Sequence, residues 1–200
     1  MKQLIEMLLE SAKTIKVYHG SGLNFNNFDD TFKGSVTGAK SAKNAFWFTD
    51  NEEVAKAYAV YAAENGVINT VMAQAKKAET KAQKTKKNSD WDIYDALLGK
   101  AEELDKYDAT HDRRKSANVK EFTIKGDFLE VDAENKTPQE LSDEGDIDSW
   151  LYEQLREARR TGKDGVIFYN LDDAVGLYNK PSTHYAVFDK KNIVGDISVN

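Results

Sequence analysis

The chain has 200 residues, of which 40% are hydrophobic and 31% are charged, and this composition suits a folded domain better than a disordered segment. It contains no cysteine, which excludes a disulfide framework, thiolate zinc sites and cysteine nucleophiles. Its 34 acidic and 28 basic side chains give a net charge of −6, so a general polyanion-binding protein is not expected, although a local basic patch is compatible with nucleic acid.

The first twelve residues carry leucines and isoleucine at helical spacing and predict a short amphipathic helix. Glu6 and Glu10 interrupt every apolar run in this segment, so it does not match a signal peptide. No stretch of the chain approaches the roughly 20 apolar residues of a membrane-spanning helix. We therefore expect a soluble, cytoplasmic protein without a membrane partner.

The first third of the chain alternates between strand, loop and helix patterns. Strand patterns occupy residues 14–19, 45–48 and 67–72. Residues 23–45 form a long loop, in which phenylalanines are either core anchors or part of a ligand-covering loop. A helix follows the second strand: Thr49 or Asp50 caps its start and Gly66 ends it.

Residues 73–118 interrupt this pattern and predict an insertion that is helical in part. Residues 73–87 are rich in lysine and lack large apolar side chains, which is typical of a solvated helix or a flexible arm. Residues 90–107 regain amphipathic spacing.

The remainder of the chain again mixes strands and helices. Strand patterns occupy residues 119–124, 128–131, 165–169, 185–188 and 193–199, and helix patterns begin at residues 137–140 and span residues 147–160. The order lacks regular βαβ alternation, so we predict one α+β domain over residues 1–200.

Histidines are few, and none has the spacing of a metal site. The three are His19, His111 and His184, and two of them stand at strand ends beside turns or polar segments, where a structural role is the commoner one. The chain lacks GxGxxG, P-loop and GxSxG motifs, which argues against common nucleotide-binding and hydrolase folds. We expect no metal cofactor.

Four blocks in order nevertheless form a recognisable pattern. They are Tyr18-His19-Gly20-Ser21, Phe46-Trp47-Phe48-Thr49-Asp50 with a following helix that carries Tyr58, Lys163 to Phe168, and Val187-Phe188-Asp189 with Ile193. In these blocks the chain resembles the ADP-ribosyltransferase superfamily of the histidine–tyrosine–glutamate type, and within it the transferases of phage and mobile-element polyvalent proteins. The resemblance covers residues 15–72 and 119–197. It implies a split antiparallel β core with flanking helices and a helical insertion, and NAD as co-substrate.

The resemblance also implies roles for individual residues. His19 would bond the adenosine ribose, the Gly20 backbone would bond the nicotinamide carboxamide, and Tyr58 would stack on the nicotinamide ring. Further NAD-binding candidates are Ser21, Thr49 and Tyr61. Two of these assignments compete with structural alternatives, because Tyr58 suits a core aromatic and Thr49 suits a helix cap.

His184 stands where the superfamily has a catalytic glutamate. A neutral imidazole can still bond a ribose hydroxyl, but it does not supply the negative charge that supports the reacting carbon. The resemblance therefore implies transfer of single ADP-ribose units, with Tyr58 and His184 as the catalytic pair. It leaves open a catalytically silent module of the same fold.

The function predicted from the sequence is NAD-dependent mono-ADP-ribosyl transfer to a macromolecule, in a phage or prophage effector or toxin. A protein is the first expected acceptor and an RNA or DNA base is the second, since the lysines from Lys76 to Lys87 suit phosphate contacts. An inhibitory partner such as an antitoxin is a further expected partner. A rival reading is an interaction protein that acts through its insertion.

Overall fold

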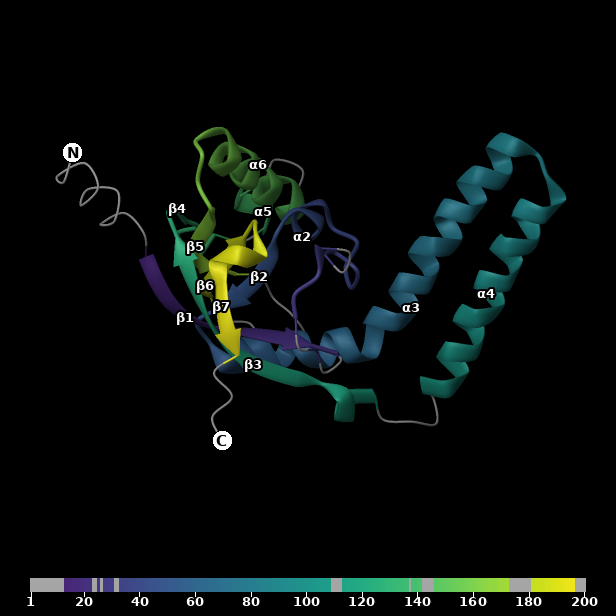
Figure 1. The fold of residues 1–200 in the computed structure, drawn as a ribbon, viewed down its shortest axis with the longest axis horizontal. Coiled ribbons are helices and arrows are strands. Elements are labelled where there is room, and N and C mark those ends of the chain that lie inside the picture. The colour runs from purple at the N-terminus through teal and green to yellow at the C-terminus, as the bar shows by residue number, and fades with distance from the viewer. Residues whose placement is uncertain are drawn as a thin grey trace.

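The computed structural model describes residues 13–22, 25, 27–30, 33–108, 113–136, 138–141, 146–172 and 181–196. Its core is one seven-stranded sheet with the order β4-β5-β6-β2-β1-β3-β7 (Figure 1). The strands are β1 (Lys13–Ser21), β2 (Phe46–Thr49), β3 (Asn118–Gly126), β4 (Phe128–Asp132), β5 (Gly165–Leu171), β6 (Ser182–Val187) and β7 (Ile193–Asp196). The helices are α2 (Lys40–Asn44), α3 (Glu52–Thr85), α4 (Asn88–Asp108), α5 (Pro138–Leu141) and α6 (Ile147–Arg160), with short 3₁₀ turns η2 (Arg113–Ser116) and η3 (Lys190–Asn192).

The sheet is divided between β1 and β2. Within the described residues these neighbours pair at one position, Tyr18 with Thr49, whereas β1 pairs with β3 from Lys13 through Ser21. One half is therefore β4-β5-β6-β2 and the other is β1-β3-β7. The neighbouring strands are antiparallel except β4 and β5, which are parallel. The predicted α+β class and its divided, mostly antiparallel core are confirmed.

Helix α6 covers one face of the β4-β5-β6-β2 half. Its side chains Leu151, Leu155 and Ala158 are buried together with Val166 and Phe168 of β5. Asp146 caps the helix start by accepting a hydrogen bond from the Asp148 amide, and basic residues occupy its last turn. The helix observed here has the bounds that the sequence pattern predicts, because cap, periodicity and charge agree.

A second apolar cluster fills the opposite face. It contains Val17, Phe46, Phe48, Phe122, Ile124, Phe128, Ile167, Tyr185 and Val187. Phe25 and Phe28 pack against this cluster, with the Phe28 ring centroid 5.1 Å from that of Phe46 and 4.9 Å from that of Phe122. The long loop is thus anchored by Phe25 and Phe28, as one of the two alternatives from the sequence predicts.

Helix α3 is 34 residues long and belongs to two environments. Its first half packs against β1, and its second half pairs with α4 in a hairpin that stands clear of the sheet (Figure 1). The predicted helix end at Gly66 and the predicted strand over residues 67–72 are both wrong. A glycine inside a helix costs only about 1 kcal/mol relative to alanine, and burial of Val71 and Ala75 in the hairpin outweighs it.

The Lys-rich part of the predicted insertion is helix rather than flexible arm, since α3 ends at Thr85 with Lys86 in the left-handed conformation. Some predictions lie outside the described residues: the helix over residues 1–12, His111, and the end of the last strand after Asp196. Among the described helices, none is both long and apolar enough to cross a bilayer.

Candidate functional site

The structure brings Tyr58 and His184 together. Their ring centroids are 6.2 Å apart and the rings meet edge to face, with an interplanar angle of 76°. Tyr58 comes from the sheet-packed half of α3, and His184 comes from β6, where Thr49 lies directly opposite it on β2. These three predicted site residues therefore converge from a helix and two neighbouring strands.

The start of α3 sets the position of Tyr58. The helix is capped by Asn51, whose side chain accepts hydrogen bonds from the amides of Glu53 and Val54. The prediction that Thr49 or Asp50 is the cap is wrong. Thr49 instead accepts a bond from the Asn51 amide at 3.2 Å, so it shapes the turn that leads into the helix.

His184 is almost fully enclosed, with 3% of its surface exposed. Its Nε2 lies 2.8 Å from the Ser182 hydroxyl oxygen, two residues earlier on the same strand. Residues two apart on a strand share a face, so Ser182 holds the ring on the side where Tyr58 lies. The His184 imidazole is thus buried, with the Ser182 hydroxyl at one edge and the Tyr58 ring beside it. Together these groups form a polar site on a largely apolar sheet.

His19 has a different environment, at the division between the sheet halves. Its Nδ1 lies 2.8 Å from the Trp47 carbonyl oxygen, and since a carbonyl only accepts, Nδ1 carries the hydrogen. Burial lowers the pKa of His19, so the ring is neutral at pH 7 and Nε2 keeps its lone pair. The ring of His19 is thus prepared to accept one hydrogen bond through Nε2.

The two histidines lie on opposite faces of the sheet. Tyr18, Thr49 and His184 are direct neighbours in register, so their side chains share a face. His19 follows Tyr18 and takes the other face, where its ring centroid is 5.2 Å from that of Phe28 and 5.5 Å from that of Phe48. The predicted grouping of His19 with Tyr58 and His184 in one cleft therefore stays a prediction, and a shared ligand would have to reach both faces where β1 and β2 part.

Gly20 is required by packing. A Cβ atom at this position would lie 1.9 Å from the Ala55 carbonyl oxygen and 2.8 Å from the Ala59 amide nitrogen, so the backbone of α3 leaves no room for a side chain. The sequence suggests a different reason, close approach of a ligand. The expected bond from the Gly20 backbone to nicotinamide stays a prediction, as do the roles of Ser21, at the end of β1, and Tyr61, one turn after Tyr58.

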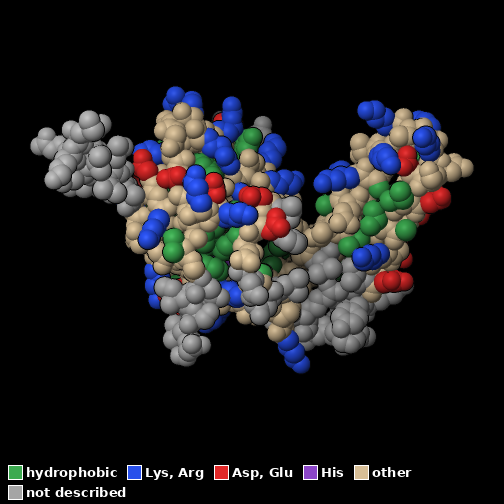
Figure 2. Space-filling model, viewed as in Figure 1, with side chains coloured by type: hydrophobic (Ala, Val, Ile, Leu, Met, Phe, Trp, Pro, Cys, Tyr) green, Lys and Arg blue, Asp and Glu red, His purple; other side chains and the backbone are tan. Residues whose placement is uncertain are grey.

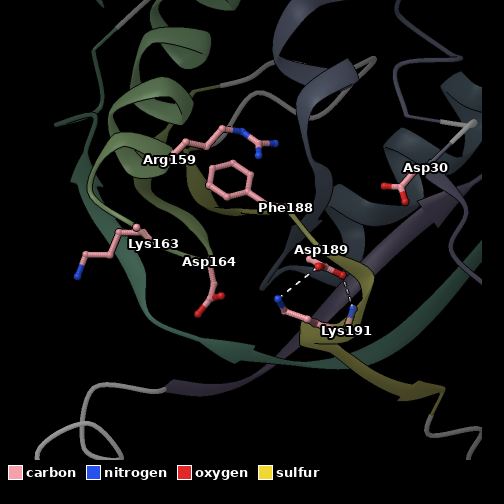
Figure 3. A pocket seen from close by; sticks show the side chains of 8 residues that line it. Asp30, Arg159, Lys163, Asp164, Phe188, Asp189 and Lys191 are labelled. Atoms are coloured by element: carbon pink, nitrogen blue, oxygen red, sulfur yellow. Dashed lines mark hydrogen bonds and ion pairs between the residues drawn. The ribbon is translucent and has the colours of Figure 1, made fainter.

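A pocket of about 470 Å³ lies near the opposite end of β6 (Figure 3). Arg159 covers the ring of Phe188 at 4.0 Å and donates to the Asn44 carbonyl oxygen, while Asp189 pairs with Lys191. Phe188 is four residues beyond His184, which corresponds to about 13 Å along a strand. The pocket lining contains none of the predicted site residues.

Within the described part of the chain, no three histidine, aspartate or glutamate side chains gather as a metal centre would need.

Residues 11–195 match the family model described as ADP-Ribosyltransferase in polyvalent proteins. Neither a curated protein nor a solved structure matches the chain.

Proposed function

Because the chain belongs to the ADP-ribosyltransferases of polyvalent proteins, we propose that it is an NAD-dependent mono-ADP-ribosyltransferase that modifies a macromolecule. In this reaction the bond between the nicotinamide nitrogen and C1′ of its ribose breaks. The electron pair of that bond neutralises the pyridinium nitrogen, and nicotinamide leaves. A nucleophilic atom of the acceptor then forms a bond to C1′ and gives up its proton to solvent.

The contact between Tyr58 and His184 is the observation that carries this proposal. A tyrosine face is suited to stacking on a flat ring, and we assign a ribose hydroxyl to His184, whose ring orientation the Ser182 hydroxyl fixes. On the other face, the free lone pair of His19 suits a hydroxyl of the adenosine ribose. His184 provides no permanent negative charge, which agrees with transfer of single units rather than chain elongation.

The proposal is tested by nicotinamide release and by the mass of modified acceptors after incubation with NAD. Tyr58→Ala and His184→Ala should each abolish both signals in a folded protein. Tyr152→Ala, a half-buried tyrosine on α6, is the matched control and should keep both. Unchanged nicotinamide release in folded Tyr58→Ala and His184→Ala variants would contradict the proposal.

A catalytically silent NAD- or partner-binding module is the second candidate, favoured by the histidine at the glutamate position. Calorimetry with NAD separates the two, because a silent module gives binding heat without nicotinamide release. A pure interaction protein would instead bind its partner through the hairpin and would neither bind nor cleave NAD.

By the same family relationship we propose a cytoplasmic phage or prophage effector or toxin, restrained by an antitoxin-like partner. Its acceptor is found by labelling a cell lysate with labelled NAD and digesting the product separately with protease and nuclease. Label lost on protease treatment alone identifies a protein acceptor, and label lost on nuclease treatment alone identifies a nucleic acid.

A further inference from the structure

The hairpin of α3 and α4 leaves a deep notch between itself and the domain. Figure 2 shows this notch in the space-filling view, with basic and hydrophobic side chains on the hairpin side that faces the domain and most acidic side chains of the hairpin on its outer side. In Figure 1, α3 is the helix nearer the domain and α4 the one farther away. The notch is therefore bounded by α3 rather than by α4.

Three lysines of α3 share the face that bounds the notch. At about 100° per residue, Lys76, Lys77 and Lys84 fall within one arc of the helix, opposite the buried Ala75 and Ala82 that pack toward α4. All three lysines are exposed. Lys86 and Lys87 lie in the turn just after the helix, so they extend the row of charges without belonging to that arc; we call these five residues the lysine face.

The lysine face is not neutralised by the hairpin itself. Lys81 pairs with the buried Asp90 at 2.6 Å and the charge of Lys87 also acts on Asp90, but Lys76, Lys77, Lys84 and Lys86 make no ion pair with a side chain that the structure describes. The exposed acids of α4 include Asp95 and Glu102, and Figure 2 shows most acidic side chains of the hairpin on its outer side. Salt screens exposed charges over about 8 Å at physiological ionic strength, so acidic side chains on the outer side offset the lysines of the notch only in part.

The domain wall of the notch adds positive charge. Helix α2 lies on the side of the domain that faces the hairpin (Figure 1), and it carries the exposed Lys40 and Lys43. The side chains of Asn69 and Thr70 on α3 donate to the Val36 and Ser35 carbonyls, which ties the loop before α2 to the floor of the notch. Exposed lysines thus stand on both sides of the notch, on the domain side together with the Asp148 carboxylate, which accepts hydrogen bonds from the Lys40 and Ser41 amides.

We propose that this notch binds the phosphate backbone of a nucleic acid, and, on the basis of the proposed function, that the nucleic acid is the ADP-ribose acceptor. From Lys76 to Lys87 the helix and its end extend about 17 Å, which spans roughly five phosphates of one strand. An acidic protein is the less suitable partner, since stable protein interfaces have an apolar centre. Between Lys76, Lys77 and Lys84 this face offers the small or polar Ala73 and Thr80, and the exposed Met72 lies at its edge, about 40° from Lys76.

The test uses the whole chain and fluorescein-labelled 20-nucleotide DNA and RNA single strands, with anisotropy measured across salt concentrations. For five phosphate contacts, log K should fall with log salt with a slope of about −3.5. Lys76→Gln with Lys77→Gln should reduce the slope to about −2 and weaken binding at least tenfold at about 0.1 M salt. Lys125→Gln with Lys190→Gln removes two exposed lysines outside the hairpin and should change neither value.

The proposal would be overturned if the protein did not bind the oligonucleotides at low salt, or if both double variants lost the same amount of affinity. Polyglutamate that competes as well as an oligonucleotide of equal charge would overturn it in favour of an acidic protein. The outcome is separable from the enzymatic proposal: wild-type protein that releases nicotinamide without binding oligonucleotides refutes only this inference. Wild-type protein that binds oligonucleotides without releasing nicotinamide refutes only the proposed function.

Discussion

The two halves of α3 are one continuous helix with opposite surroundings. The first half lies so close to β1 that Gly20 and Gly22 have no room for a side chain, and Ala55 and Ala59 are almost completely buried. The second half pairs with α4 along an alanine-rich stripe, bonds the loop before α2 only near its start, through Asn69 and Thr70, and leaves most of its lysines exposed. Packing density therefore changes along a single element, and the dense half supplies the proposed site while the open half supplies the proposed docking surface.

Gly20→Val disturbs the packing of the dense half of α3 and should have the largest effect on stability. The new side chain would collide with backbone atoms of α3 that no rotamer change can move, so we expect a loss of at least about 3 kcal/mol in the free energy of unfolding. Gly99→Ala is the control in the hairpin. A Cβ there meets nothing within 4 Å, and removing a helical glycine should stabilise by about 0.5–1 kcal/mol. Urea denaturation measures the free energy of unfolding of both variants. Equal values would contradict the difference in packing between the two halves of α3.

Alanine-to-leucine changes within α3 sharpen the same contrast. Ala59 is 1% exposed, so Ala59→Leu overpacks the contact with β1 and should cost about 1–3 kcal/mol. Ala73 is exposed, so Ala73→Leu should stay within about 0.5 kcal/mol of wild type. Thermal unfolding of both variants tests this, and a comparable loss from Ala73→Leu would mean that the second half is packed after all.

Asn51→Ala tests which residue begins the dense half. Loss of the two hydrogen bonds from the cap should cost about 1 kcal/mol in unfolding free energy. The Asp50 carboxylate accepts a bond from the Thr183 amide at 3.3 Å and, among the described residues, none from the first turn of α3, so Asp50→Ala should cost less. If denaturation shows the reverse order, the cap is Asp50 as the sequence pattern suggests.

The smallest effect concerns pH. Because burial lowers the pKa of His19, the unfolded chain takes up a proton first as pH falls through about 6.5. The stability that comes from neutral His19 is complete above that value and is lost below it, until the folded ring also titrates. The melting temperature should therefore decrease more between pH 7.5 and pH 5.5 in the wild type than in His19→Gln. An identical decrease in the two proteins would show that His19 has the same pKa in the folded and the unfolded chain.

Local signals predicted most elements but not their extents. Helix α6 has a cap, an amphipathic stripe and basic last turn that all agree, and its bounds are as predicted. Gly66 is a poor end signal because contacts with α4, distant from it in sequence, keep the helix intact. The sequence alone does not single out Asn51 as the cap, because Thr49 and Asp50 beside it are also common cap residue types.

The candidate site was predictable only through family resemblance. Nothing local in the sequence relates Tyr58 to His184, and their contact arises because β2 pairs with β6 and α3 follows β2. The bond from His19 to the Trp47 carbonyl depends on where β1 and β2 part, which no pattern in either strand reveals.

The connection between β1 and β3 has a consequence for how the chain reaches its native state. These strands pair along nine residues, yet α2, β2, α3 and α4 lie between them in sequence. Distant pairing is slow, whereas a helical hairpin assembles from near neighbours. We expect a refolding experiment on single-tryptophan variants to report the environment of Trp91 on α4 earlier than that of Trp47 on β2. Simultaneous signals would show that the projecting hairpin and the sheet form in one cooperative event.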